Sequence, residues 1–203
     1  MDEQVLTEVR RLIAAEPAAV TSARERAGQA TTPPSPEVGA LLRWAVSTCD
    51  ARTAVEIGAA AGVSGLWLLG ALPARGVLTS IEPDPHAHGL AGAAFEEAAA
   101  GSRVRSILGD PGTVLPRLSD AAYDVALLQS DPEGYPDDLD HARRLLRPGG
   151  ILIARNVLRP GEHGEALARF VKTLAEDPAF EATVLPIDGG LALATRKVDP
   201  TEA

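Results

Sequence analysis

Residues 54–64 read AVEIGAAAGVS, a short apolar run followed at once by a turn of small residues. The run at 54–57 predicts a buried strand, and the glycines after it predict a tight turn into a helix. Gly58 permits this turn and the close approach of a ligand to the backbone, and Gly62 permits close packing of helix on strand. A dinucleotide-binding fingerprint would have another glycine where this chain has Ala60. The turn therefore predicts a ligand site without naming the ligand.

Further apolar runs follow at regular intervals, at residues 77–81, 104–108, 125–128 and 151–154, with helical stretches between them. Strands that alternate with helices indicate a parallel sheet covered on both faces. Residues 180–185 and 191–195 then flank an Asp-Gly-Gly turn, which predicts an antiparallel hairpin. We therefore expect one α/β domain over residues 1–203. Its Rossmann-like seven-stranded sheet has five parallel strands and a C-terminal antiparallel hairpin, with helices on both faces.

Residues 1–30 predict a helical extension in front of the α/β unit of residues 31–198. The first helix carries a one-sided apolar stripe made of Val5, Val9, Leu12 and Ile13. Such a stripe must dock either on its own subunit or on a partner subunit, and we expect a homodimer.

The segment TTPPSP at residues 31–36 cannot form a helix or pair in a sheet, so it predicts an extended connector. Ser35 followed by Pro36 predicts the start of a helix that ends near Ser47. Trp44 on this helix and Trp67 on a later one lie among Leu and Ala, and both are predicted to pack in the core.

Composition excludes several classes of function. The chain has 203 residues and a net charge of −9, with its basic residues scattered among acids, so we expect no nucleic-acid partner. Cys49 is the single cysteine, which excludes an internal disulfide and a zinc framework. No apolar run approaches the roughly 20 residues of a membrane span. We expect a soluble cytoplasmic protein that does not bind membranes.

Two further motifs also fall at carboxyl ends of predicted parallel strands, where open α/β sheets bind ligands. Glu82 lies 24 residues after Gly58, where a carboxylate can accept hydrogen bonds from both hydroxyls of a ribose. Gly109-Asp110 ends the third strand and leaves room for a flat base. Glu82 could instead cap the following helix, and Ser64 could be an ordinary first-turn residue.

Residues 31–198 resemble the class I S-adenosylmethionine-dependent O-methyltransferases of the catechol and caffeoyl-CoA type, in particular a bacterial branch. The resemblance rests on the spacing from Glu56 and Gly58 through Glu82 to Gly109, and on LLRPGG at residues 145–150. It implies S-adenosylmethionine as the cofactor. The cofactor-binding residues that it implies are Pro34, Glu56, Gly58, Ala59 and Ser64 near the methionine and sugar, Glu82 at the ribose, and Pro83, Gly109 and Asp110 at the adenine.

The chain departs from the family at the methyl acceptor. Family members that use a divalent cation carry an Asp after the fourth strand and an Asp-Asn pair after the fifth. Here Gln129 and Arg155 replace the two carboxylates, and only Asn156 remains. Mg²⁺ and Ca²⁺ prefer anionic oxygen ligands, so a guanidinium in this place predicts that no metal binds. We assign Gln129 to the cofactor site instead.

The lysine that helps family members to deprotonate the acceptor aligns with Pro132. The remaining candidates for catalysis are Asp131, Arg155 and Asn156, although Asp131 could be only a turn residue. We predict methyl transfer to a hydroxyl of a small molecule that is acidic already, is deprotonated by a side chain, or is assisted by Arg155. Two alternatives stay open: an N- or carboxyl-methyltransferase with the same donor site, or a catalytically silent cofactor-binding protein.

Overall fold

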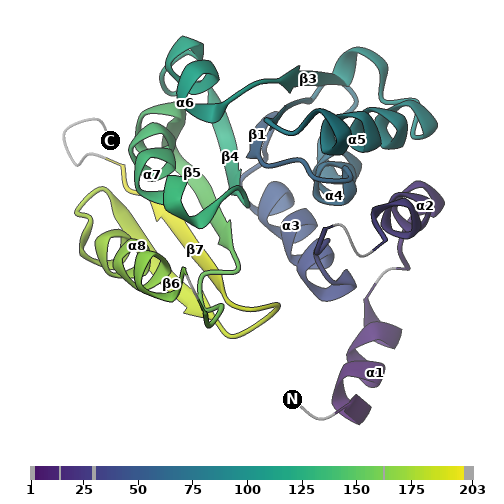
Figure 1. The fold of residues 1–203 in the computed structure, drawn as a ribbon, viewed down its shortest axis with the longest axis horizontal. Helices are drawn as coiled ribbons and strands as arrows, with labels where there is room; N and C mark the ends of the chain where they lie inside the picture. Colours follow the sequence, from purple (N-terminus) through teal and green to yellow (C-terminus); the bar gives the residue numbers. More distant parts are fainter. Residues whose placement is uncertain (1–2, 14, 29–30, 162, 199–203) are drawn as a thin grey trace.

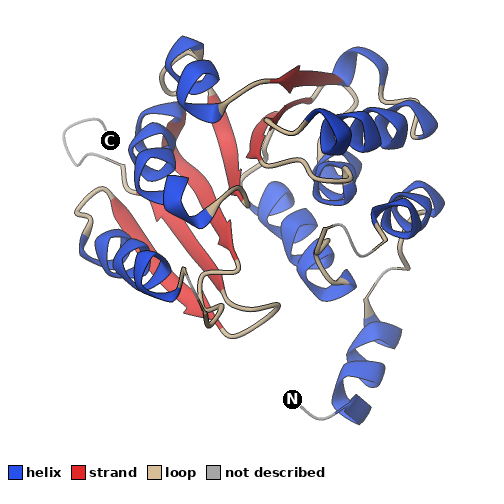
Figure 2. Cartoon of the chain, viewed as in Figure 1, coloured by secondary structure: helices blue, strands red, loops and turns tan. Residues whose placement is uncertain are grey.

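A computed structural model describes residues 3–13, 15–28, 31–161 and 163–198. One twisted sheet crosses the molecule, and helices lie on both of its faces (Figures 1 and 2). The strand order is β3-β2-β1-β4-β5-β7-β6. Pairing is parallel from β3 to β5, and β7 is antiparallel to both β5 and β6. The predicted sheet of five parallel strands and a hairpin is confirmed. The strands are β1 (Thr53–Ile57), β2 (Val77–Glu82), β3 (Val104–Leu108), β4 (Tyr123–Leu128), β5 (Leu146–Arg155), β6 (Phe180–Leu185) and β7 (Leu191–Arg196).

Most of the predicted helices begin or end at the residues that the sequence marks. The hydroxyl of Ser35 accepts a hydrogen bond from Val38 N at 3.2 Å and caps the helix that starts at Pro36. The described helices are α1 (Glu3–Leu12), α2 (Ala18–Ala27), α3 (Pro36–Thr48), α4 (Val63–Ala71), α5 (Pro85–Glu97), α6 (Pro111–Val114), α7 (Tyr135–Leu145) and α8 (Gly164–Glu176), with short 3-10 turns η1 (Gly101–Arg103), η2 (Leu115–Arg117) and η3 (Pro132–Gly134).

Two hydrophobic cores lie back to back across the sheet, because successive strand residues point to opposite faces. On β1, Ala54 packs against the layer formed by α2 to α5, and Val55 packs against the layer formed by α7 and α8. Leu127 and Leu128 on β4 divide in the same way. The central strands are therefore buried on both faces, which explains their continuous apolar runs.

Two predictions about local structure are wrong. β5 begins at Leu146, not near Ile151, because Leu146 already pairs with Tyr123 and a bulge then restores the register at Ile151. Trp44 is not in the core, because 59% of its surface is exposed. Trp67, in contrast, is buried.

Helix α1 projects from the α/β body beside α3, as Figure 1 shows. An ion pair between Arg10 and Glu37 links the two helices at 2.7 Å. The apolar stripe of α1 is only partly covered within the chain: Val9 and Ile13 are half-buried, whereas Val5 is 50% and Leu12 84% exposed. Within the described residues, no helix has the length and apolar character needed to cross a membrane.

Candidate functional site

The loop between β1 and α4 adopts the strained turn that its sequence predicts. Gly58, Ala60 and Gly62 have φ angles of +89°, +47° and +81°. A Cβ atom on Gly58 would lie 2.9 Å from the carbonyl of Gln129, so only glycine fits between the two loops. Gly62 abuts Ala91 of α5, which corrects the expectation that it relieves packing of helix on strand. No side chain caps α4 at Gly62, which leaves its first N–H groups without a side-chain acceptor.

Glu82 ends β2 directly beside this loop. One carboxylate oxygen accepts a hydrogen bond from Ala60 N at 2.8 Å, and the other accepts one from Asp84 N at 3.0 Å. Each oxygen of a carboxylate can accept more than one hydrogen bond. Two backbone groups thus fix the orientation of this carboxylate and leave it able to accept from a ribose, so the residues present fit the predicted cofactor.

Glu56 lies fully buried beneath the start of α4. Its two oxygens accept hydrogen bonds from the hydroxyls of Ser64, at 2.9 Å, and Ser80, at 2.7 Å. Burial raises the pKa of Glu56 to about 7, although both hydroxyls favour the charged form. A Cβ on Gly65 would lie 2.6 Å from this carboxylate, so the glycine makes room for it. Glu56 therefore positions Ser64.

The residues predicted around the adenine lie at the ends of β2 and β3. Gly109 N donates to the carbonyl of Glu82 at 3.0 Å, which joins the two strand ends. Asp110 is exposed, and its carboxylate accepts a hydrogen bond from Thr113 N at 3.0 Å to cap α6. Pro83 is exposed beyond β2, and Pro34 is buried in the connector. Contact of these residues with a cofactor stays a prediction.

Gln129 and Arg155 meet at the carboxyl ends of β4 and β5. The side-chain amide of Gln129 donates to the carbonyl of Gly58 and to the hydroxyl of Ser64, both at 2.5 Å. Arg155 donates from Nη1 to Oε1 of Gln129 at 2.9 Å, and from Nη2 to the carbonyl of Thr32 at 3.4 Å. A polar chain therefore runs from Glu56 through Ser64 and Gln129 to Arg155.

This arrangement does not fit a divalent cation. A buried guanidinium lies against the only oxygen that Gln129 could offer as a ligand, and like charges would repel. Among the described residues, no group of three or more His, Cys, Asp or Glu side chains could hold a metal. We therefore derive no chemical step through a metal.

The other two catalytic candidates lie near this junction but are constrained. Asp131 is exposed and caps η3, accepting a hydrogen bond from Glu133 N at 3.1 Å, as a turn residue would. Asn156 has a φ of +59°, and its Oδ1 lies 3.4 Å from where a Cβ on Gly189 would be. The end of β5 therefore packs closely against the turn between β6 and β7.

The sequence did not reveal that this turn is tied to the connector. The carboxylate of Asp188 accepts a hydrogen bond from Ser35 N at 2.6 Å, across 153 residues. Asp-Gly-Gly marks a turn, but no sequence pattern could show where its carboxylate points. Ser80 was also missed; its only signal was a polar residue in the middle of an apolar strand.

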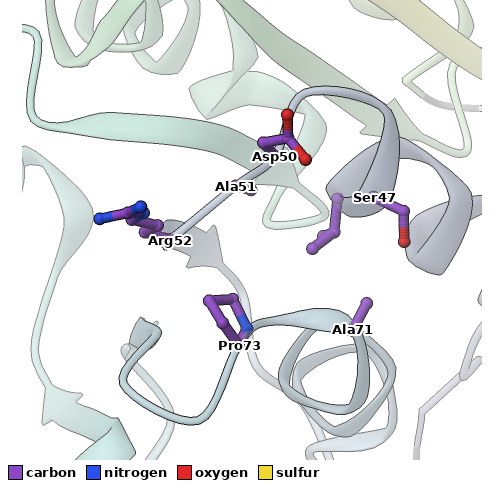
Figure 3. Close-up of a pocket in the computed structure, with 7 residues that line it drawn as sticks. Ser47, Asp50, Ala51, Arg52, Ala71 and Pro73 are labelled. Carbon is purple, nitrogen blue, oxygen red and sulfur yellow. The ribbon is translucent and has the colours of Figure 1, made fainter.

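Two hollows border this architecture on opposite edges of the sheet. One, of about 470 Å³, lies beside the ends of β4 and β5 and is lined by Asp131, Pro132, Arg159, Pro160, His163 and Leu167. The other, of about 500 Å³, lies at the start of β1, where Asp50 faces Ala71 and Pro73 (Figure 3). The second hollow is remote from Glu82 and Arg155. Only the first borders the predicted acceptor side.

The fold and the site define a class: an open α/β protein with a nucleoside-binding edge at the carboxyl ends of its parallel strands. Comparison with known proteins then identifies the family. A profile of the O-methyltransferase family matches residues 13–197. A protein of Mycobacteroides abscessus named "Putative O-methyltransferase" is 39% identical over 188 residues, which cover 87% of each chain.

Solved structures agree. A Corynebacterium glutamicum protein superposes with a TM-score of 0.87 at 28% identity, over 97% of both chains. The O-methyltransferase TomG of Streptomyces achromogenes, solved with S-adenosylmethionine, superposes with a TM-score of 0.85 at 25% identity, over 98% of this chain and 100% of TomG. The chain belongs to the O-methyltransferase family.

Proposed function

We propose that the protein transfers the methyl group of S-adenosylmethionine to an oxygen of a small molecule. The observation that carries this proposal is the carboxylate of Glu82, held by Ala60 N and Asp84 N beside the Gly58 turn. This is a site for the two hydroxyls of a ribose. Membership of the O-methyltransferase family supports the reaction, and the S-adenosylmethionine in TomG supports the methyl donor.

The methionine end of the donor lies, in this proposal, between Gly58, Ala59 and Ser64 on one side and Pro34 of the connector on the other. Gly109, Asp110 and Pro83 border the adenine. Because Gln129 already bonds to Gly58 O and Ser64 Oγ, it links the donor loop to the acceptor side. Gln129 either contacts the cofactor itself or positions Ser64, which does.

Catalysis follows mainly from positioning. The sulfonium of the donor already activates the methyl group, and holding donor and acceptor at near-attack distance contributes up to roughly 7–11 kcal/mol in good cases. Without a metal, the positive charge beside the acceptor comes from Arg155. Asn156, the residue after Arg155, offers a neutral polar side chain. Asp131 is the weakest catalytic candidate, because its carboxylate already caps η3.

We also propose that the active form is a cytoplasmic homodimer. The support is the stripe on α1, whose Val5 and Leu12 stay exposed in the single chain. Large apolar side chains gathered on one exposed face mark an interaction surface. A single cysteine in 203 residues fits a reducing compartment.

Isothermal titration calorimetry tests the donor site. We expect S-adenosylhomocysteine to bind with micromolar-range affinity and NAD⁺ not to bind, because Ala60 stands where the dinucleotide fingerprint has glycine. Incubation with S-adenosylmethionine and a panel of phenols and carboxylic acids, followed by mass spectrometry, then tests the reaction. Absence of S-adenosylhomocysteine binding, or binding of NAD⁺ in its place, would refute the proposal.

A further inference from the structure

Arg155 carries a buried charge without an ionic partner. Only 3% of its surface is exposed. Its two hydrogen bonds go to neutral oxygens, those of Gln129 and Thr32, and its Nε has no hydrogen-bond partner at all. No carboxylate among the described residues lies within ion-pair distance of it. Buried charges in proteins are normally paired, because an unpaired one loses its hydration without compensation.

The surrounding charges do not compensate for this one. Asp188 acts on Arg155 from a distance, and its carboxylate already accepts Ser35 N. Arg24 and Arg159 act in the opposite sense, and Arg24 is itself paired with Glu16. Burial, the largest influence, lowers the pKa of the guanidinium below its ordinary value. Asp188 therefore supplies a negative charge at a distance, but no described carboxylate is in contact with the guanidinium of Arg155.

A second polar atom without a partner lies in the same part of the molecule. The hydroxyl of Thr31 is buried and makes no hydrogen bond, and the next residue, Thr32, supplies the carbonyl that contacts Arg155. That contact is 3.4 Å long, at the weak end of hydrogen bonding. Native structures leave few buried polar atoms unsatisfied, and those that remain call for an explanation such as a ligand.

The described acidic and imidazole groups around this end are already engaged. Asp131 caps η3, Asp188 holds the connector, and Glu56 is enclosed by two serines. His163 lies in the neighbouring hollow, within 3.3 Å of Glu133. Asp138, with a pKa raised by burial to about 6, accepts a hydrogen bond from Ser130 Oγ at 2.8 Å. A neutral alcohol would have to give up its proton to one of these engaged groups, whereas an acceptor that is already ionised needs no base.

We propose that the methyl acceptor binds as an oxyanion, a carboxylate or the conjugate base of an acidic phenol or enol, with its oxygen between Arg155 Nε and the Thr31 hydroxyl. This inference rests on the proposed methyl transfer and names its substrate class. In this proposal the acceptor takes the place of the long contact between Arg155 and the carbonyl of Thr32.

The resulting step is balanced without a base or a metal. The oxyanion attacks the methyl carbon of S-adenosylmethionine, a C–O bond forms, and the C–S bond breaks with its electron pair left on sulfur. The negative acceptor and the positive sulfonium give a neutral ether or ester and the neutral thioether of S-adenosylhomocysteine. No proton is transferred.

The test uses 4-nitrophenol, whose phenolate absorbs visible light, titrated with pH in the presence of protein saturated with S-adenosylhomocysteine. We expect the pKa of the bound phenol to fall by about one unit or more relative to the free phenol, because the buried guanidinium favours the anion. Arg155→Gln should abolish the shift, and Arg155→Lys should restore part of it. Arg169→Gln, on the exposed face of α8, is the matched control and should keep the shift in full.

Calorimetry with S-adenosylhomocysteine on each variant shows whether the anion that Arg155 binds belongs to the acceptor or to the cofactor. Unchanged affinity in Arg155→Gln supports the acceptor as the source. A loss on the order of tenfold, with the phenol shift retained, would assign the anion to the carboxylate of the cofactor and overturn the inference. Wild type that binds S-adenosylhomocysteine but binds 4-nitrophenol only as the neutral phenol, or not at all, would also overturn it, even if a variant failed to fold. Wild type that does not bind S-adenosylhomocysteine would refute the proposed function itself.

Discussion

The donor half of the site, around Glu82 and Glu56, and the acceptor half, around Arg155, differ in how their polar groups are hydrogen-bonded. On the donor side, Glu82 and Glu56 each accept two hydrogen bonds at 3.0 Å or less, all of them from within the fold. On the acceptor side, Arg155 keeps an unpaired Nε, and Thr31 keeps an unpaired hydroxyl. The donor half is complete before a ligand binds, whereas the acceptor half is not.

The difference shows what each half recognises. In the proposed function, the prearranged carboxylate of Glu82 binds one constant feature, the ribose of the cofactor, at little cost in ordering. In the acceptor half, the buried guanidinium of Arg155 makes only a long contact to the connector, so an anionic ligand would give it the charged partner that it lacks. Gln129 links the two, because one end of its amide bonds to the donor loop and the other to Arg155.

The largest expected effect concerns Glu56. Its pKa of about 7 in the folded state lies above the ordinary 4.5, so folding favours the protonated form. The resulting stability is fully present below pH 4.5 and is lost as the pH rises through 7. The free energy of unfolding of Glu56→Gln should therefore rise relative to wild type by about 3 kcal/mol between these limits. Urea unfolding at several pH values measures it.

Comparison with Glu96→Gln, at an exposed position on α5, removes general effects of charge. The difference also removes the contribution of Asp138, whose raised pKa of about 6 is common to wild type and variant. If the difference in free energy of unfolding between Glu56→Gln and wild type did not change with pH, Glu56 would be ionised at little cost. The donor half would then be less enclosed than its geometry indicates.

The next effect concerns the affinity for the donor. Glu82→Ala removes a charged acceptor from the ribose site, which costs about 1.5–3 kcal/mol, or on the order of tenfold to a hundredfold in S-adenosylhomocysteine affinity. Calorimetry measures it, with Glu96→Ala as the control. Equal binding by Glu82→Ala and wild type would remove the ribose assignment and leave the rest of the donor site standing.

A smaller effect on the site, with a clear effect on assembly, should follow from deletion of residues 1–13, which removes α1 and leaves α2 in the core. We expect sedimentation to show a dimer for the full chain and a monomer for the truncated one, because the deletion removes the exposed stripe with Leu12. Binding of S-adenosylhomocysteine should persist. Leu12→Asp should weaken the dimer in the full-length chain. Identical sedimentation of all three proteins would contradict a dimer role for α1.

Removal or addition of divalent metal ions should have no effect. Binding of an acceptor analogue and turnover should be unchanged by EDTA and by added Mg²⁺, because Arg155 occupies the place of an anionic ligand. A double variant, Gln129→Asp with Arg155→Asp, restores two carboxylates and should gain a response to Mg²⁺. Loss of turnover on chelation of wild type would show a metal site after all, with Asp131 as the first ligand to examine.

The sequence predicted most of the fold because burial in a parallel sheet imposes a local pattern. Alternation of apolar runs with helices located the strands, and Gly58, Gly62 and Glu82 predicted the donor edge. Two local predictions failed for tertiary reasons. Trp44 lies on an apolar stretch of α3, but it lines an open hollow beside β5, β6 and β7 and stays 59% exposed. β5 starts early because Leu146 finds a partner in Tyr123 across a bulge.

The sequence by itself therefore determined the fold class and the family and predicted the donor edge, since these depend on the spacing of residues along single strands and turns. Its resemblance to the family also predicted that Gln129 and Arg155 stand in the places of two carboxylates. Only the tertiary structure decided what those replacements do. The bond from Arg155 to Gln129, the contact with Thr32 and the link from Asp188 to Ser35 join segments 26, 123 and 153 residues apart. No local pattern encodes them, because the direction of a side chain across such distances depends on how the whole chain packs.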